Sequence, residues 1–315
     1  MPGTPPPRYG YLGPSGTFAE TALLQVSSAE RAERVPFASV DAALHAVRVG
    51  EADQAMVPIE NSVEGGVSST LDALAVGDPL VVVREVLVPV RFVLAARPGT
   101  ALGAVRRVST HPHAQAQCRR WLAEHLPAAD YVPGLSTAAA AAGLASAAPP
   151  AGYDAALCAV IAAEQYGLDV LAEDVADNPD AVTRFVLVSR PAPPPPPTRA
   201  DKTSVVVFQA DDHTGGLLEL LEQFATRGIN LTRIESRPTG SSLGHYSFSI
   251  DCEGHIAEAR VADALAGLHR VCTEVRYLGS YPRANGEPLH VTATTTDRAF
   301  TDSRAWVDRL REGRA

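Results

Sequence analysis

A run of prolines divides the chain into two parts. Six of the seven residues from Pro191 to Pro197 are prolines. Proline donates no backbone hydrogen bond and favours the extended polyproline II conformation, so this run cannot lie inside a helix or in the middle of a sheet. We therefore expect two domains joined by a stiff linker at residues 191–201. The length of 315 residues also exceeds the usual size of a domain with a single hydrophobic core.

Composition excludes several classes of function. The chain is 46% hydrophobic and 20% charged, which is typical of a globular protein rather than a disordered or membrane protein. A net charge of -9 without clusters of lysine and arginine argues against a nucleic-acid partner. The apolar run at 138–148 is shorter than the roughly 20 residues of a membrane-spanning helix, and residues 1–8 lack the features of a secretory signal. We expect a cytoplasmic protein that binds small molecules.

The residue inventory also limits the chemistry. Cys118, Cys158, Cys252 and Cys272 lie far apart without a C-x-x-C pair, which predicts buried, reduced thiols and neither a zinc site nor a disulfide framework. Lys202 is the only lysine and directly follows the linker, so a P-loop or Schiff-base mechanism is not expected. No G-x-G-x-x-G motif follows a strand. We therefore expect a reaction without a metal or cofactor.

Apolar periodicity predicts two kinds of α/β arrangement. Before the linker, short Val/Ile/Leu runs alternate with helical patterns, with helix starts expected at Thr17, Ser69 and Pro112. After the linker, the order of elements is βαββαβ, which is typical of a ferredoxin-like unit. Its strands are predicted at 203–209, 229–236, 246–252 and 275–278, and its helices at 215–226 and 256–268.

Two polar loops are candidate binding segments. Ser15, Gly16 and Thr17 lie between a predicted strand and a capped helix, where N–H groups and hydroxyls could bind a carboxylate. A simple tight turn with an N-cap is the alternative. The segment from Asn61 to Gly65 follows an apolar strand, and polar groups at such a strand end usually face a ligand cleft. A solvated loop is the alternative there.

Two further segments are ambiguous on their own. Thr183 and Phe185 are expected on one face of a strand and Arg184 on the other, so the three cannot line one pocket without a bulge. The start of an edge strand would explain them equally well. His111 and His113 form an H-x-H pair without a nearby carboxylate or cysteine, which indicates the start of a helix more than a metal site.

Taken together, these segments resemble the prephenate dehydratase family. The motifs Tyr11-Leu-Gly-Pro-Ser-Gly-Thr-Phe18, Pro58-Ile-Glu-Asn-Ser-Val-Glu-Gly65 and Thr183-Arg-Phe185 have the family's order and spacing. The C-terminal unit resembles the family's ACT domain, with Asp212-His-Thr-Gly-Gly-Leu217 opening its first helix and Glu235-Ser-Arg-Pro238 ending its second strand. The resemblance covers roughly residues 8–282.

Three departures from the family pattern stand out. Ser15 replaces an acidic residue and His113 replaces a glutamine, which we expect to adjust the site. Thr214-Gly-Gly-Leu217 replaces a Pro-Gly-Ala-Leu run. The loss of a rigid proline and a methyl group predicts a less preorganised effector loop.

The resemblance implies a fold and domain boundaries. The catalytic domain, residues 8–190, is expected to have a two-lobed, periplasmic-binding-protein-like (type II) fold. Lobe 1 would contain residues 8–88 and 171–190, and lobe 2 residues 89–170. The linker at 191–201 would lead to an ACT domain at 202–282, followed by a tail at 283–315 to which we assign no function.

The resemblance also implies the reaction, which is the decarboxylative dehydration of prephenate to phenylpyruvate for phenylalanine biosynthesis. Thr183 is the catalytic candidate, as a hydrogen-bond donor to the leaving hydroxyl, and the proton would come from Glu64 or from water. Arg184 has a structural alternative, and Phe185 would pack against the ring or support its strand. The implied substrate-binding residues are Ser15, Gly16, Thr17, Asn61, Ser62, Gly65, Arg184 and Phe185.

The implied effector is L-phenylalanine, bound between paired ACT domains of a homodimer or homotetramer. The implied effector-binding residues are His213, Thr214, Gly215, Gly216, Leu217, Leu218, Glu235, Ser236, Arg237 and Pro238. Two rival functions share these motifs: an arogenate dehydratase and a non-catalytic amino-acid sensor. An exported solute-binding protein would require a signal, which the first residues do not show.

Overall fold

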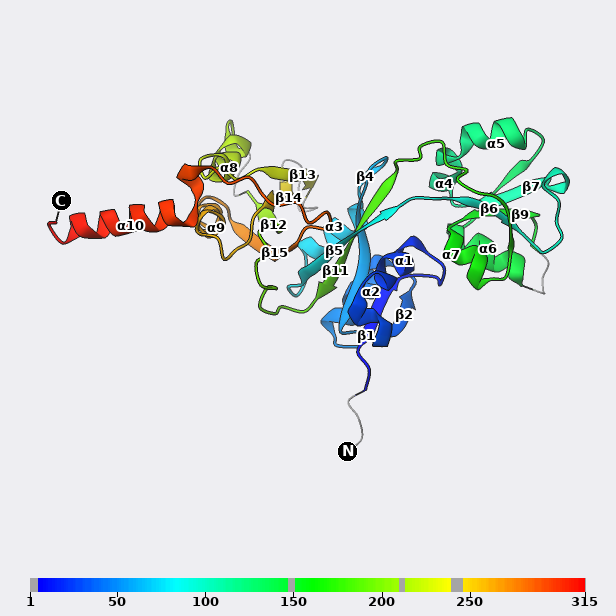
Figure 1. The fold of residues 1–315 in the computed structure, drawn as a ribbon, viewed down its shortest axis with the longest axis horizontal. Helices are drawn as coiled ribbons and strands as arrows, with labels where there is room; N and C mark the ends of the chain where they lie inside the picture. Colours follow the sequence, from blue (N-terminus) through cyan, green and yellow to red (C-terminus); the bar gives the residue numbers. More distant parts are fainter. Residues whose placement is uncertain (1–4, 147–150, 210–212, 239–245, 315) are drawn as a thin grey trace. The chain divides into compact units, whose positions relative to one another are not determined.

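The computed structural model describes residues 5–146, 151–209, 213–238 and 246–314 (Figure 1). These residues form two compact units. The first contains the described residues up to Thr70 together with Val86–Leu187, and the second contains Leu71–Glu85 and the described residues from Val188 onwards. The boundaries of the predicted linker and domains stay a prediction. Asp212 of the predicted effector motif and the end of the apolar run at 138–148 lie outside the described residues.

Two sheets, which share one arrangement of three parallel strands, build the two lobes. In each, three neighbouring strands are parallel and the earliest of the three lies in the middle. This repeated topology confirms the predicted two-lobed α/β architecture. The first sheet runs β2 (Glu33–Phe37), β1 (Arg8–Leu12), β3 (Gln54–Asn61), β11 (Val182–Ser189), β5 (Val81–Pro89), with β4 (Gly65–Gly66) paired to β3. The second runs β8 (Asp130–Pro133), β7 (Arg107–Thr110), β9 (Ala155–Cys158), β6 (Val93–Ala96), β10 (Asp169–Ala172).

Alternation along the strands of the second sheet explains its burial. Leu94 and Leu157 pack into one apolar cluster, while their neighbours Val93 and Cys158 pack into another. Because successive side chains of a strand point to opposite faces, both faces of this sheet are covered. The alanine-rich helix α6 (Thr137–Ala145) packs closely on one of them.

Local capping signals position the helices of the lobes. Thr17 caps α1, since its hydroxyl accepts a hydrogen bond from the Glu20 N–H at 3.4 Å. His111 caps α4, whose first residue is Pro112, so the predicted helix starts at Thr17 and Pro112 are confirmed. The helix predicted to start at Ser69 begins one residue earlier, at Ser68. The helices are α1 (Phe18–Leu24), α2 (Val40–Arg48), α3 (Ser68–Ala75), α4 (Pro112–Gln117), α5 (Arg119–His125), α6 (Thr137–Ala145) and α7 (Val160–Gln165). Short 3-10 turns occur at Ser27–Arg31, Leu102–Ala104 and Ala293–Thr295.

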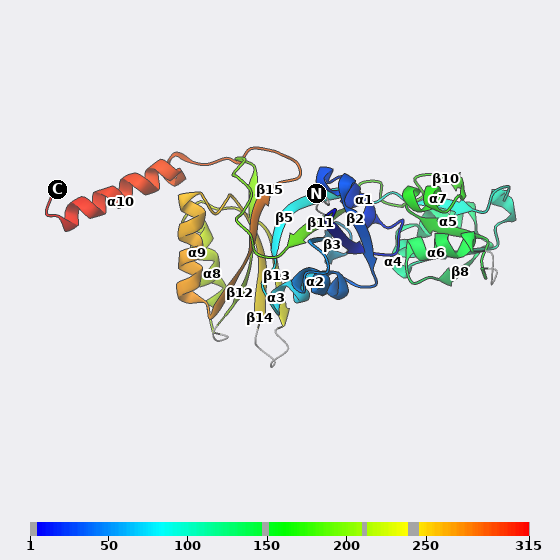
Figure 2. The same cartoon turned by 90° about the horizontal axis from the view of Figure 1, so that it is seen from below.

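The second unit contains the predicted βαββαβ order. Its sheet runs β13-β14-β12-β15 with antiparallel neighbours, and α8 and α9 cover one face (Figure 2). Val205, Phe224, Ile250 and Leu268 form part of the core between that face and the helices. The elements are β12 (Asp201–Phe208), α8 (Gly216–Ala225), β13 (Leu231–Pro238), β14 (Tyr246–Glu253), α9 (Ala259–Val271) and β15 (Glu274–Pro282).

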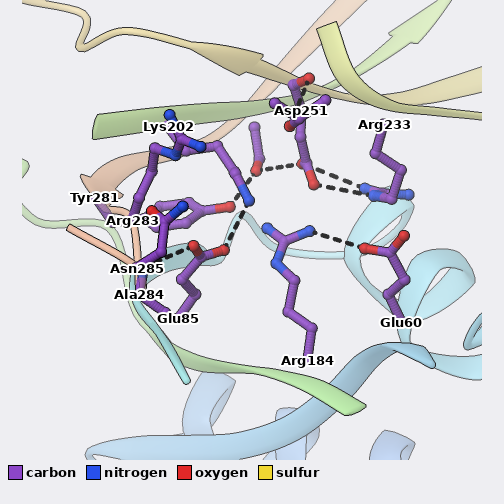
Figure 3. A network of polar contacts seen from close by, with 12 residues as sticks. Glu60, Glu85, Arg184, Lys202, Arg233, Asp251, Tyr281, Arg283, Ala284 and Asn285 are labelled. Atoms are coloured by element: carbon purple, nitrogen blue, oxygen red, sulfur yellow. Dashed lines mark hydrogen bonds and ion pairs between the residues drawn. The ribbon is translucent and has the colours of Figure 1, made fainter. Parts of the chain in front are cut away.

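Buried polar groups lie between the strands of this unit and the segment at Glu85 (Figure 3). Asp251 accepts hydrogen bonds from Ser204 at 2.6 Å and from the Arg233 guanidinium at 3.0 Å. The ammonium group of Lys202 lies 2.9 Å from the Glu85 carboxylate. Each of these charged groups is buried against an opposite charge, which is the usual condition for burying a charge. The only lysine of the chain therefore belongs to a structural ion pair.

The tail contains a helix, and one cysteine differs from its prediction. Helix α10 (Asp297–Arg311) follows Thr296, whose hydroxyl caps it by accepting from the Ala299 N–H at 3.2 Å. Cys272 is partly exposed, so the prediction of four buried thiols holds for the other three. No helix among the described residues is long and apolar enough to cross a membrane.

Candidate active site

A cleft of about 720 Å³ opens between the two lobes of the first unit. The hairpin that joins β3 to β4 and the start of α3 line it from the first lobe, together with Thr183 on β11. The second lobe contributes the starts of α4 and α6. The rings of Phe18 and Phe92 meet edge to face in its wall, with centroids 5.5 Å apart. The cleft thus combines an apolar wall with polar groups from both lobes, as ligand sites usually do.

Thr183 and Asn61 form the polar centre of the first lobe's side. The Asn61 side-chain oxygen accepts from the backbone N–H groups of Val63 at 2.8 Å and Glu64 at 3.1 Å. Its amide nitrogen is thereby turned toward Thr183 and donates to the Thr183 hydroxyl oxygen at 2.8 Å. Since that oxygen accepts from Asn61, the Thr183 O–H is oriented to donate elsewhere, and both residues line the cleft.

Glu64 faces donors from the second lobe. Its Oε2 lies 2.8 Å from Nδ1 of His113, and its Oε1 accepts from the Gln117 amide at 3.4 Å. His113 and Gln117 are four residues apart on α4 and therefore share one face of that helix. All three residues line the cleft. The sequence indicated that His113 adjusts the site but did not indicate its partner.

His111 presents a neutral imidazole to the cleft. Burial, followed by the nearby charge of His113, lowers its pKa, while the charge of Glu64 opposes this shift. Its Nδ1 accepts from the His113 N–H at 3.3 Å, which places its ring proton on Nε2. Among the described residues no group of three or more His, Cys, Asp or Glu side chains could hold a metal ion.

Helix N-termini surround the cleft. Phe18 begins α1, Ser68 begins α3 and Thr137 begins α6, and each of these residues lines the cleft. The first N–H groups of a helix lack partners within the helix, and the helix dipole is positive at this end. A cleft with several such ends favours an anion.

The predicted donors of the Ser15–Thr17 loop are already used within the protein. The carboxylate of Glu20, which is 4% exposed, accepts from the Gly16 N–H at 2.7 Å and from the Ser15 hydroxyl at 2.9 Å. The Thr17 hydroxyl donates to the Leu12 carbonyl at 2.8 Å. Leu12, Gly13 and Phe18 line the cleft from this segment instead. Glu20 was not singled out from the sequence, because its position in a helix gives no sign of burial.

Gly16 brings this loop close to the second lobe. Its φ is +87°, and a Cβ atom there would lie 3.0 Å from Ala162 on α7. The Tyr166 hydroxyl donates to the Ser15 carbonyl at 3.1 Å, and the Gln165 amide donates to Glu20 at 3.2 Å. The loop therefore holds the two lobes together beside the cleft.

Four other predicted residues occupy different places. Gly65 lines the cleft with φ +82°, a backbone conformation that suits glycine. Ser62 exchanges hydrogen bonds of 2.9 Å with the backbone of Val182. Arg184 pairs with Glu60 at 3.4 Å, as its predicted structural alternative required, and Phe185 is 3% exposed in the core. These contacts place the β3–β4 hairpin beside β11, although the two segments are far apart in the sequence.

The predicted effector residues lie on two segments of the second unit. Gly215 has φ +93° and precedes α8, and the exposed Leu217 and Leu218 follow it. A Cβ at Gly216 would meet the side chains of Gln209 and His213 at about 3 Å, so the glycine makes room for them. His213 lies 3.4 Å from Glu219. Thr214 is exposed in the turn between His213 and Gly215.

The second segment is the end of β13. Arg237 forms a bidentate ion pair with Asp72 on α3, in which Nε and Nη2 donate to the two carboxylate oxygens at 2.9 and 2.7 Å. This hydrogen bonding raises the pKa of Arg237. Glu235 lies 3.6 Å from Arg233, while Ser236 and Pro238 pair with Phe248 and Tyr246 of β14. The predicted effector strand is thereby tied to Asp72, which lies in the same unit.

Comparisons with known proteins agree with this geometry. The family model for prephenate dehydratase matches residues 9–193, and the model for the ACT domain matches residues 204–270. A prephenate dehydratase of Amycolatopsis methanolica is 49% identical over 97% of this chain and 98% of its own length.

Two solved structures extend the comparison. The crystal structure of prephenate dehydratase from Arthrobacter aurescens in complex with L-Phe is 61% identical, with a TM-score of 0.92 over 97% of this chain and 99% of that one. GqqA, described as a novel type of quorum quenching acylase, is 32% identical, with a TM-score of 0.77 over 87% of this chain and 97% of its own. The motifs, the two-lobed fold and these matches together show that the chain belongs to the prephenate dehydratase family.

Proposed function

We propose that the cleft converts prephenate to phenylpyruvate, with loss of water and carbon dioxide, as a step of phenylalanine biosynthesis. The observation that carries this proposal is the Asn61–Thr183 hydrogen bond of 2.8 Å at the cleft. It orients the Thr183 hydroxyl so that it can donate to the leaving hydroxyl of the substrate. Asn61 acts through Thr183.

The rest of the cleft suits a dianion with a ring. Prephenate carries two carboxylates, and the helix starts at Ser68 and Thr137 supply N–H donors and positive dipole ends. The edge-to-face pair of Phe18 and Phe92 offers an apolar wall for the ring. A carboxylate held against such a wall is poorly solvated, which favours its loss as carbon dioxide.

The proton for the leaving hydroxyl comes from Glu64 in this proposal. A neutral threonine hydroxyl can hydrogen-bond the departing oxygen but is a poor acid. Glu64 lines the same cleft and has a side chain that is 33% exposed, so it can exchange protons between substrate and solvent. Water is the alternative donor.

L-phenylalanine regulates the reaction through the ACT domain. The relative from Arthrobacter aurescens was crystallised with L-Phe, and the same two effector segments occur here on α8 and β13. Thr214 and Gly216 stand where the family has proline and alanine, so binding weaker than in the family is expected. The protein acts in the cytoplasm as a homodimer or homotetramer, in which paired ACT domains complete the effector site.

The test is turnover by the purified chain. Prephenate is added with and without L-phenylalanine, and phenylpyruvate is followed by its absorbance in alkali. Turnover that phenylalanine alters supports both parts of the proposal. Turnover of arogenate but not of prephenate would reassign the substrate. No turnover of either compound would favour a sensor without catalysis.

A further inference from the structure

The contact between His113 and Glu64 holds an exchangeable proton at the cleft. A ring nitrogen and a carboxylate oxygen 2.8 Å apart are joined by one proton, which either group can carry. Gln117 donates to the other oxygen of Glu64 at 3.4 Å and so fixes the rotation of the carboxylate. Both contacts come from one face of α4.

The proposed reaction consumes one proton. The bond between the ring and its carboxylate breaks, carbon dioxide leaves, and the electron pair of that bond enters the ring. The ring C–O bond breaks with its electron pair on oxygen. Prephenate dianion thus becomes phenylpyruvate monoanion, carbon dioxide and hydroxide, and the hydroxide becomes water only when a proton is supplied. Each turnover therefore requires that the donor be protonated again.

We propose that His113 is a positioning residue that holds Glu64 at the cleft and returns to it the proton spent in each turnover. This inference rests on the proposed function and on Glu64 as the donor. Glu64 protonates the leaving oxygen, the resulting carboxylate takes the Nδ1 proton of His113, and neutral His113 takes a proton from water. The His113 side chain is 65% exposed and that of Glu64 is 33% exposed. His113 is therefore the member of the pair that can more readily exchange a proton with water.

The groups that face His113 are compatible with this role. Glu64 faces it from the β3–β4 hairpin, and the His111 ring packs edge to face on it, with centroids 4.9 Å apart. Burial lowers the pKa of His111, so that imidazole stays neutral near pH 7 and leaves the exchangeable proton to the His113–Glu64 pair.

The main test compares His113→Gln with the wild type. Glutamine keeps a donor to Glu64 but cannot give up a proton. Wild-type kcat is expected to fall as the pH rises, because the relay passes a proton through an imidazole. For His113→Gln we expect a flat profile and a kcat about tenfold lower near pH 6.5, with KM changed less than about threefold.

His125→Gln is the matched control. His125 stacks on Trp121 at the end of α5, so this variant removes an imidazole that does not contact Glu64. It should keep the wild-type pH profile. Added imidazole should restore part of the turnover of His113→Ala, because the ring position is exposed.

A second readout does not depend on turnover. The NMR signal of the His113 ring, identified by its loss in His113→Gln, should change its chemical shift in Glu64→Gln, since the carboxylate that lies 2.8 Å from Nδ1 is replaced. An unchanged signal would overturn the pairing. If the wild type is active and His113→Gln has the same pH profile of kcat, this inference alone is overturned. If the wild type does not turn over prephenate, the proposed function is overturned as well.

Discussion

The Thr183 hydroxyl is oriented by a short chain of hydrogen bonds. Backbone N–H groups of the hairpin hold the Asn61 oxygen, and the Asn61 amide in turn donates to Thr183. Preorganised donors of this kind stabilise charge that develops on a leaving oxygen. The position of Thr183 therefore depends on a loop more than a hundred residues away in the sequence.

Thr183→Ala tests this arrangement. We expect kcat to fall by about 10²–10³-fold, because the donor to the leaving hydroxyl is lost. Thr183→Ser, which keeps a hydroxyl, should retain most of the turnover. Urea unfolding of both variants separates lost chemistry from lost stability, and a Thr183→Ala variant with near-normal kcat would refute the role.

An ion pair joins the predicted effector strand to helix α3. Strand β13 carries Arg237, whose guanidinium contacts the Asp72 carboxylate at 2.9 and 2.7 Å. We expect this ion pair to contribute to the response of the enzyme to phenylalanine, because it ties an effector segment to a neighbouring element.

Asp72→Asn tests the connection between these elements. We expect turnover without phenylalanine to stay within about twofold, because Asp72 does not line the cleft, and the effect of phenylalanine on kcat/KM to weaken about fivefold. Asp302→Asn removes a more exposed, single-contact ion pair with Arg298 on α10 and serves as the control for the loss of one negative charge. A full phenylalanine response in Asp72→Asn would contradict the expectation.

The Lys202–Glu85 ion pair joins strand β12 to the end of the 71–85 segment. Both side chains are buried, and Glu85 also accepts from the Ala284 N–H at 2.8 Å (Figure 3). Lys202→Met should lower the free energy of unfolding by about 3–5 kcal/mol, because a buried carboxylate loses its counter-charge. Adding Glu85→Gln removes that charge but keeps the acceptor, so the double variant should regain part of the loss. Urea denaturation measures both, and a Lys202→Met variant as stable as wild type would argue against the pair.

At the scale of the whole molecule, the predicted effector segments carry exposed apolar side chains. Leu217 and Leu218 are 43% and 59% exposed, and Ile234, which directly precedes the second segment, is 43% exposed. A homodimer or homotetramer through the ACT domains would cover them and complete the effector site. Light scattering should therefore give a mass of at least twice 33.1 kDa. A mass of one chain at working concentrations, with phenylalanine present, would contradict this assembly.

The sequence by itself determined the family, the two kinds of α/β arrangement and the order of the elements. These follow from local information: periodicity along each strand and helix, capping residues such as Thr17 and His111, and the linker prolines. The βαββαβ order was predicted with strand ends within a few residues, because each element's apolar pattern is independent of its partners. The same local information could not show that Glu20 is buried or that Cys272 is partly exposed.

Only the tertiary structure decided which polar groups meet. Asn61 and Thr183, Glu64 and His113, and Arg237 and Asp72 are joined across lobes or distant strands. The donors of Ser15 and Gly16 look available in the sequence, yet Glu20 takes them. The physical reason is that a hydrogen bond depends on distances between atoms far apart in the chain. Such distances exist only once the sheets have paired and the helices have packed.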